Sequence, residues 1–125
     1  MKMIGTEEIL IFHKKIIKQT GGLYGVRDIG LIESALNRAS VTFDGIELYK
    51  SIEDKISVIT YGLIKNHGFV DGNKRIGVST MLLLLRINDI QIHYTQNELV
   101  QLGLGIADGS LDEKEINKWI KNHIL

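Results

Sequence analysis

The chain has 125 residues, of which 44% are hydrophobic and 24% charged, proportions typical of one globular domain. Its 15 basic and 15 acidic residues cancel, so overall charge favours neither nucleic acid nor an anionic membrane as a partner. Because it contains no cysteine, disulfides, thiolate catalysis and cysteine-based metal sites are excluded. We expect a single domain over residues 1–125 and, since the first residues lack an apolar signal segment, a cytoplasmic location.

Helical periodicity dominates the first part of the chain. Apolar residues recur at helical spacing after Thr6, which we expect to cap a helix that ends at Gly21–Gly22. Asp28 is a candidate cap for a second helix. Between Ser40 and Tyr49, the turn dipeptide Asp44–Gly45 stands among apolar residues, which predicts a short β-hairpin.

The rest of the chain predicts four further helices. Ser51 should cap the third, and a strongly apolar helix from about residue 73 to Ile87 should be the hub of the fold. Thr95 and Ser110 each begin a capping box and should each start a helix. Three glycines are expected to separate these last two helices: Gly103, Gly105 and Gly109. The expected fold class is therefore all-α, a compact bundle of about six helices around a central buried helix, with a short β-hairpin.

The most unusual stretch runs from His67 to Arg75 and reads His-Gly-Phe-Val-Asp-Gly-Asn-Lys-Arg. It leads into the start of the most apolar helix, where free backbone N–H groups favour anions. Lys74 and Arg75 add two cations where the helix dipole disfavours them, which indicates a bound polyanion such as a phosphate chain. Asp71 offers an oxygen ligand suited to Mg²⁺, and His67 is a candidate general base. Taken singly, each residue also fits a structural or solvated role, so the residues alone leave both interpretations open.

This stretch resembles the signature loop of the Fic/Doc superfamily, His-Pro-Phe-x-Asp/Glu-Gly-Asn-Gly/Lys-Arg. Residues 21–28, Gly-Gly-Leu-Tyr-Gly-Val-Arg-Asp, and residues 10–13 resemble segments of its death-on-curing (Doc) branch. Adenylyl-transferring members have Gly where this chain has Lys74, and a second Arg where it has Val78, which also favours the Doc branch. Gly68 replaces the family's proline, which should give the loop more backbone freedom.

The resemblance implies a toxin of a type II toxin–antitoxin system. Such a toxin would transfer the γ-phosphate of ATP to a Ser/Thr hydroxyl of a translation protein such as elongation factor Tu. The implied catalytic residues are His67, Lys74 and Arg75; the implied nucleotide-binding residues are Gly72, Asn73, Lys74 and Arg75; the implied Mg²⁺ ligand is Asp71. By motif position, His67 takes the hydroxyl proton, and the two cations neutralise phosphoryl charge. The implied cofactors are ATP and Mg²⁺, and the implied partner is a Phd-like antitoxin.

Two alternative functions stay open, namely AMP transfer to a protein hydroxyl and a catalytically weak co-repressor that binds an antitoxin. The resemblance also implies that residues 40–49 form a flap that pairs with the target's extended backbone. The self-inhibitory helix motif of some Fic proteins has its nearest match at Ser40–Gly45, with Asp44 in place of Glu. Its partner arginine is absent at Val78, so inhibition is expected from a separate antitoxin.

Several side chains outside the motif are interpreted as structural or solvated. His13 is placed on the helix face opposite much of the apolar stripe, where support of the site and plain burial are both open and a structural role is favoured. His93 and His123 are placed on the surface. Arg27 and Asp28 are expected to pair and so to hold the segment after the first helix near the motif. Two aromatic residues are assigned to the core: Phe69 and Trp119.

Overall fold

The computed structural model describes residues 1–125 and has six α-helices and one short hairpin. In chain order the helices are α1 (Thr6–Thr20), α2 (Ile29–Asn37), α3 (Ile52–Lys65), α4 (Asn73–Ile87), α5 (Gln96–Ala107) and α6 (Glu113–His123). A 3₁₀ turn, η1 (Arg38–Ser40), follows α2 and leads to β1 (Thr42–Phe43) and β2 (Ile46–Glu47). The two strands pair antiparallel, with Phe43 opposite Ile46. This architecture confirms the all-α prediction and the hairpin.

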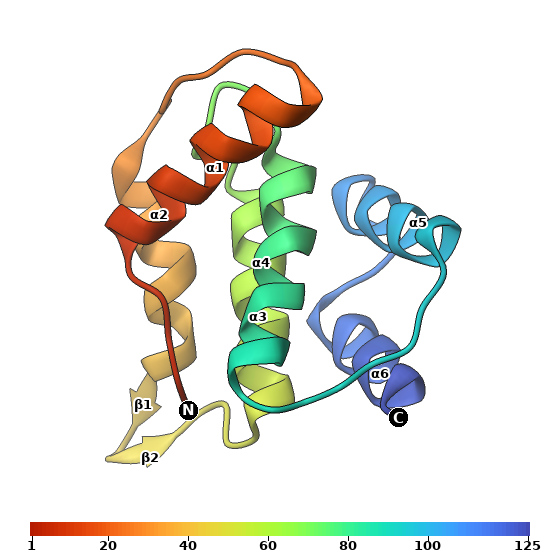
Figure 1. Ribbon diagram of the computed structural model, residues 1–125. Helices are drawn as coiled ribbons and strands as arrows, with labels where there is room; N and C mark the ends of the chain where they lie inside the picture. Colours follow the sequence, from red (N-terminus) through yellow and green to blue (C-terminus); the bar gives the residue numbers. More distant parts are fainter.

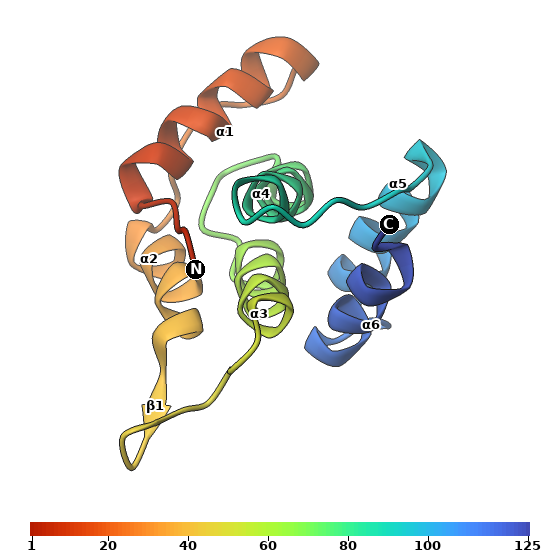
Figure 2. The same ribbon diagram turned by 60° about the horizontal axis from the view of Figure 1, so that its bottom comes forward.

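α3 and α4 form a central antiparallel pair (Figures 1 and 2), with α1 and α2 on one side and α5 and α6 on the other. α3 contacts α2, α4, α5 and α6, whereas α4 contacts α1, α3 and α5. The predicted hub, α4, therefore shares that place with α3. Ile56, Ile59 and Ile64 of α3 are fully buried, while Leu82 and Leu83 of α4 stay half-buried on its open face. No helix is both long and apolar enough to span a bilayer.

Side-chain caps fix three of the helix starts where the sequence predicts them. Asp28 accepts hydrogen bonds from backbone N–H groups in the first turn of α2. Ser51 caps α3, and Thr95 forms a reciprocal capping box with Glu98 at the start of α5. Each such cap contributes about 1 kcal/mol to helix stability.

Two predicted helix starts are wrong by one or two residues because other residues occupy the N-cap positions. At α1 the cap is Gly5, one residue before the predicted position, since the Gly5 N–H donates to Glu8 Oε1 at 3.0 Å. At α6 the cap is Asp112. Ser110 belongs to the preceding turn instead, where its Oγ donates to the Gly105 carbonyl at 3.2 Å and its N–H donates to Asp108 Oδ1 at 2.8 Å.

Two of the glycines predicted to separate the last helices lie inside α5. A Cβ on Gly105 would come within 2.5 Å of Leu111 Cδ1, so this glycine allows the turn after α5 to pack against the helix. Gly103 is also helical. Only Gly109, with φ +86°, lies in the turn itself, where it supplies a left-handed backbone conformation.

The hairpin lies at the N-terminal end of α3, while the motif loop lies at the C-terminal end (Figure 1). α3 has 14 residues and is therefore about 21 Å long. The hairpin therefore does not border the motif loop, and its pairing with a target's extended backbone stays a prediction. The reason is the direction of α2, which starts next to the loop and leads the chain away from it.

His123 is largely buried rather than on the surface, with 16% of its side chain exposed. Its ring stacks on the partly buried Trp119 at 4.0 Å, and its Nδ1 and Nε2 lie 2.6 Å from the Trp119 carbonyl oxygen and from Glu98 Oε2. Bonds from His123 and from Thr95 lower the pKa of Glu98 to about 2. Burial alone would lower the pKa of His123, but its bonds to Glu98 and Trp119 outweigh burial and raise it. His93, in contrast, is exposed as predicted.

These pKa shifts predict how the Glu98–His123 pair contributes to stability as pH changes. The pKa of Glu98 falls from 4.5, so its contribution is complete above 4.5 and is lost as pH drops through about 2. The pKa of His123 rises above 6.5, so its contribution is complete below 6.5 and is lost at higher pH. A double-mutant cycle with Glu98→Gln and His123→Gln measures the coupling of the two side chains in the free energy of unfolding. This coupling should be largest between pH 4.5 and pH 6.5. A coupling that does not decline in alkaline solution would contradict the prediction.

Candidate active site

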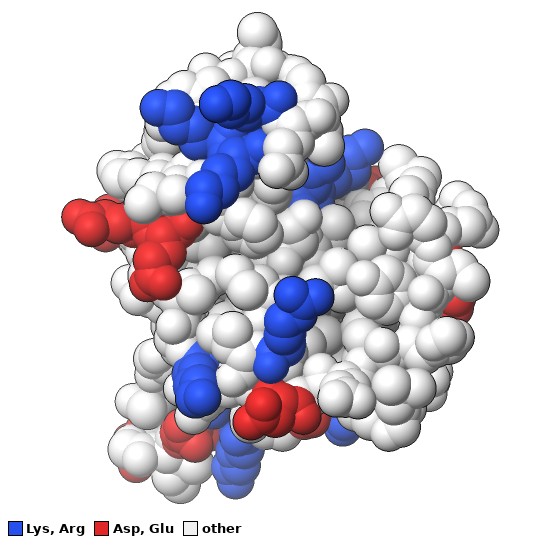
Figure 3. Space-filling view, viewed as in Figure 1, with Lys and Arg blue, Asp and Glu red and all other residues white.

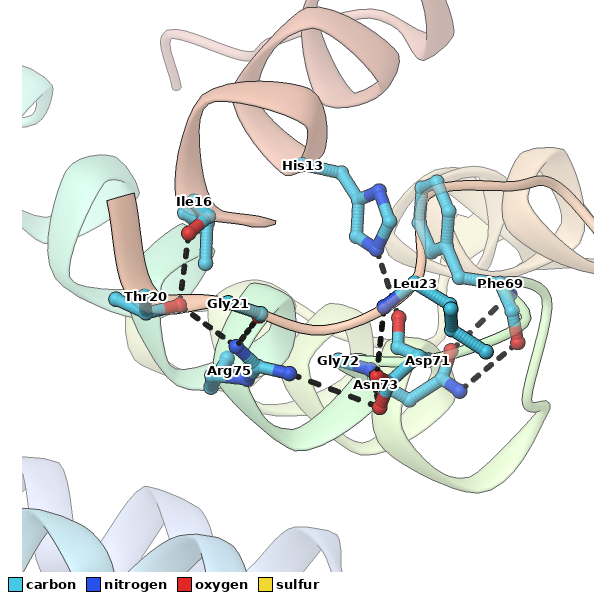
Figure 4. Close-up of polar contacts among 10 residues, drawn as sticks. All are labelled: His13, Ile16, Thr20, Gly21, Leu23, Phe69, Asp71, Gly72, Asn73 and Arg75. Atoms are coloured by element: carbon cyan, nitrogen blue, oxygen red, sulfur yellow. Dashed lines mark hydrogen bonds and ion pairs between the residues drawn. The ribbon is translucent and has the colours of Figure 1, made fainter. Parts of the chain in front are cut away.

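The loop between α3 and α4 is clamped by the first residue of α4. Asn73 Oδ1 accepts from the Phe69 N–H at 3.1 Å, and Asn73 Nδ2 donates to the Phe69 carbonyl at 3.0 Å (Figure 4). Phe69 is 2% exposed, which confirms its place in the core. Because both ends of the Asn73 amide are bonded to Phe69, this side chain shapes the loop.

The start of α4 presents uncapped backbone N–H groups. Its N-cap, Gly72, has φ +76°, and no side chain caps the helix. The first helical hydrogen bond runs from the Ile76 N–H to the Gly72 carbonyl. The N–H groups of residues 73–75 therefore lack a carbonyl partner within the helix. This end of α4 can therefore receive an anion through its backbone.

His67 lies at the end of α3 in a left-handed backbone conformation, with φ +51°. Such a conformation is uncommon for a residue other than glycine and is found often at functional sites. The side chain is exposed and lines a pocket of about 440 Å³. The other motif residues that line this pocket are Val70, Asp71, Gly72, Asn73, Lys74 and Arg75.

Arg27 holds the end of α3 next to this histidine. Its Nε donates to the His67 carbonyl at 2.6 Å, and its Nη2 donates to the Asn66 carbonyl at 3.0 Å. A cation at a helix C-terminus also interacts favourably with the helix dipole. Asp28 is bonded to its own helix, so the predicted pairing of Arg27 with Asp28 is wrong, although Arg27 does hold this segment at the motif.

The segment between α1 and α2 runs along the motif loop. The N–H groups of Arg27 and Asp28 both donate to the Gly68 carbonyl, at 2.8 and 3.0 Å. The Val70 N–H donates to the Gly25 carbonyl at 3.0 Å, and residues 26 and 69 form an antiparallel bridge. This segment, rather than the hairpin, is the extended backbone that borders the loop.

Gly68 is held firmly, so the predicted gain in backbone freedom is wrong. Besides the two bonds to its carbonyl, the residue packs closely against α2. A Cβ on Gly68 would lie 2.5 Å from Ile32 Cγ1 and 3.3 Å from the Asp28 carbonyl oxygen. The glycine therefore allows close approach of α2 to the loop.

Asp71 is ionised and held in place by backbone groups. Its Oδ2 accepts from the Leu23 N–H at 3.0 Å, and its Oδ1 accepts from the Gly72 N–H at 2.7 Å. These bonds, with the nearby Arg75 guanidinium at 3.6 Å, lower the pKa of the Asp71 carboxyl. Its side chain remains 42% exposed, so the charge is accessible from the pocket.

The two cations of the motif differ in their surroundings. Arg75 Nη1 donates to Thr20 Oγ1 and to the Gly21 carbonyl, both at 2.6 Å, which ties α4 to the end of α1. Lys74 is exposed and forms no ion pair. Lys74 is therefore the motif cation that is free to bind a ligand.

His13 is a positioning residue, one of the two roles that the sequence left open for it. It is fully buried, stacks on Phe69 at 3.8 Å, and its Nε2 lies 2.7 Å from the Asp71 carbonyl oxygen. Because that partner is an acceptor, Nε2 carries the proton. His13 shares its helix face with the buried Ile9 and Ile17, so its predicted position opposite the apolar stripe is wrong. The i, i+4 spacing of these three residues was the signal in the sequence.

Basic side chains gather at the end of the molecule that carries the motif. In Figure 3 blue side chains cluster over the C-terminal half of α1 and near the start of α4. The exposed lysines on this part of α1 are Lys14, Lys15 and Lys18. A chain of zero net charge thus has a locally positive end, which favours an anionic ligand there.

Comparison with known proteins identifies the family. The sequence matches the model of the Fic/DOC family over residues 4–85. It is 31% identical to the protein kinase Doc of Escherichia phage P1 over 119 residues, which cover 93% of this chain and 90% of that protein. The chain belongs to the Fic/Doc family. It is also 38% identical to the toxin Doc of Mycolicibacterium smegmatis over 72 residues, which cover 58% of this chain and 55% of that toxin. These relatives place it in the death-on-curing branch.

The Fic/Doc motif residues converge on one pocket, but they are used in different ways. His67, Asp71 and Lys74 present accessible side chains to it. Asn73 and Arg75 direct their side chains mainly to Phe69 and to the end of α1. The single carboxylate fits Mg²⁺ only if phosphate oxygens complete the coordination, since no three carboxylate or imidazole groups cluster in this protein.

Two adjacent glycines of this Fic/Doc protein allow the Asp71 environment to be tested. Both have positive φ, so an alanine strains the backbone at either. At Gly22 the added Cβ would also lie 2.6 Å from Asp71 Oδ2 and 2.8 Å from Arg75 Nη2, whereas at Gly21 it would meet nothing within 4 Å. We expect Gly22→Ala to displace the carboxylate from the Leu23 N–H and raise its pKa toward 3.8.

The matched control, Gly21→Ala, should lose stability but keep the low pKa of Asp71. NMR titration of the Asp71 side-chain carboxyl in both variants measures this difference directly. Equal pKa values in the two variants would show that the close packing at Gly22 does not hold the carboxylate.

Proposed function

We propose that this Doc-like toxin transfers the γ-phosphate of ATP to a serine or threonine hydroxyl of a translation protein, such as elongation factor Tu, in the cytoplasm. One observation carries the proposal: a single pocket brings together an exposed histidine, an ionised carboxylate, a free lysine and an uncapped helix N-terminus. This combination suits phosphoryl transfer, in which positioning and charge stabilisation supply most of the rate.

The proposed reaction is one in-line displacement. His67 accepts the proton of the target hydroxyl, whose oxygen attacks the γ-phosphorus. The bond from that phosphorus to the oxygen bridging the β- and γ-phosphates breaks, and ADP leaves. The N–H groups at the start of α4 and the Lys74 ammonium stabilise the charge on the phosphoryl oxygens. Arg75, tied to the end of α1, adds positive charge beside them.

Mg²⁺ would be held by Asp71 together with phosphate oxygens of the nucleotide. When bound, the ion would neutralise part of the phosphate charge. The contribution of this chain is the orientation of the carboxylate, which the Leu23 and Gly72 N–H groups fix. His13 supports the same residue through its hydrogen bond to the Asp71 carbonyl.

Phosphate transfer is favoured over AMP transfer by two residues. Lys74 occupies a position at which adenylyl-transferring members have glycine, and Val78 occupies the position of their second arginine. A lysine at the helix start adds bulk and charge where a glycine would leave room for a phosphate. The group that appears on the modified target, phosphate or AMP, shows which of the two reactions has taken place.

The variant His67→Ala should reduce target modification by about 10²-fold or more, the range expected for loss of a general base. The matched control is His93→Ala, because His93 is exposed and far from the motif in the sequence. Purified protein, ATP, Mg²⁺ and a candidate target are incubated, and the target is examined by mass spectrometry. Added phosphate supports the proposal, added AMP supports the alternative, and unchanged modification by His67→Ala would refute the assigned base.

Inhibition is proposed to come from a separate Phd-like antitoxin. The nearest match to a self-inhibitory motif, Ser40–Gly45, runs from η1 into the hairpin, at the far end of α3 from His67. The chain expressed alone should therefore arrest bacterial growth, and coexpression with the neighbouring reading frame should restore it. Normal growth at verified levels of folded protein would contradict this prediction and favour the co-repressor function.

A further inference from the structure

The hairpin carries its apolar side chains on one face. Its turn residues, Asp44–Gly45, have φ values of +52° and +76°, and positive φ at both positions is typical of a type I′ turn. Phe43 lies opposite Ile46 in the register. The Leu48 N–H donates to the Val41 carbonyl at 3.0 Å, so these two residues form a further cross-strand pair. Because opposite residues of paired strands and alternate residues of one strand share a face, the four side chains lie together.

This apolar face points away from the body of the protein. Glu47 lies on the other face, opposite Thr42, and its Oε1 is 3.3 Å from Lys55 Nζ of α3. The polar face is therefore the one that turns toward the helix. Phe43 is 75% exposed, and the other three apolar residues of the hairpin are between 41% and 60% exposed. Contiguous apolar surface of this kind marks a protein–protein interface.

The base of the hairpin is fixed to α3 and α6. Arg38 of η1 donates to the Tyr49 hydroxyl at 2.9 Å and pairs with Glu113 of α6 at 2.5 Å. Lys55 of α3 also donates to the Tyr49 carbonyl. The hairpin therefore projects from the bundle in a fixed orientation (Figures 1 and 2). A rigid surface loses little conformational entropy when it binds a partner.

Two unpaired charges lie at opposite ends of the hairpin. Asp44 is in the turn and Lys50 follows the second strand; both are exposed, and neither forms an ion pair within the chain. Suppose that two copies pack by their apolar faces around a twofold axis, with the hairpins running in opposite directions. Asp44 of each copy then lies near Lys50 of the other. Hairpins running in the same direction would instead bring the two Asp44 side chains together, which is unfavourable.

We propose that the apolar face of the hairpin binds the same face of a second copy of this chain, in a twofold antiparallel arrangement. The face carries no charge, so two copies can cover each other without burying an unpaired charged group. Specific interfaces bury about 1,200–2,000 Å² in total, and four side chains from each copy supply less than that, so the dimer should be weak. His67 lies at the other end of α3, so its pocket stays open in the dimer.

Sedimentation equilibrium of the full chain should show a dimer with a dissociation constant between about 10 μM and 1 mM. The variant Ile46→Thr removes apolar surface from both copies at once and should weaken the dimer by about tenfold or more. Its matched control is Ile11→Thr on α1, the same substitution at a residue that is 58% exposed, against 60% for Ile46. The control should dimerise like the wild type, and both variants should stay folded because neither side chain is in the core.

The two charges test the antiparallel arrangement. Lys50→Glu places a negative charge beside Asp44 of the other copy and should weaken the dimer by about threefold or more. Asp44→Asn removes the charge but keeps a residue type that tolerates positive φ. It should weaken the wild-type dimer slightly and strengthen the Lys50→Glu dimer, where it removes a repulsion. This reversal requires contact between different copies, because one hairpin holds residues 44 and 50 at its opposite ends.

Three results would overturn the inference. One is a wild type that stays monomeric up to about 1 mM. Another is a dimer that Ile11→Thr weakens as much as Ile46→Thr, which would place the interface elsewhere. The third is a monomer in which Ile46→Thr, but not Ile11→Thr, abolishes growth arrest, since the apolar face would then bind the target instead of a second copy. The proposed function is tested separately, by modification of the target at the His67 pocket.

Discussion

The backbone pairing between residues 21–28 and the motif loop is the contact on which the site depends. The Gly68 carbonyl accepts two N–H groups from this segment, and the Leu23 N–H in turn binds the Asp71 carboxylate. Through these bonds the end of α1, the start of α2, the end of α3 and the start of α4 are fixed relative to one another. The close packing of Ile32 against Gly68 stabilises the same junction. Loss of this pairing would release the carboxylate and the loop together.

The nine-residue motif combines structural and chemical roles. Asn73 clamps the loop on Phe69, and Arg75 ties α4 to the last turn of α1. Because these side chains hold the backbone, the helix N-terminus stays open and His67 and Lys74 stay accessible. The buried His13 adds a further constraint through its hydrogen bond to the Asp71 carbonyl. Positioning of this kind is what phosphoryl transfer requires of a protein.

The distribution of charge also favours phosphate binding at the start of α4. Basic groups concentrate at the end of α1 and the start of α4, although the chain as a whole is neutral (Figure 3). A phosphate chain would be attracted to that end. The acidic and basic partners elsewhere, such as Glu98 with His123, serve to join helices. Arg75 has both roles, since it ties α4 to the end of α1 and lines the pocket.

The sequence by itself determined the helices, three of their caps, the hairpin and the motif, because these depend on residues within a few positions of one another. Asp28, Ser51 and Thr95 cap helices through bonds spanning two or three residues, and such bonds can be read locally. Contacts between distant residues decided the rest. Which segment borders the motif depends on the direction of α2, and the role of His13 depends on an acceptor 58 residues away. Likewise, Arg27 binds carbonyls at the end of α3 rather than its neighbour Asp28, because folding brings an unsatisfied helix terminus within its reach.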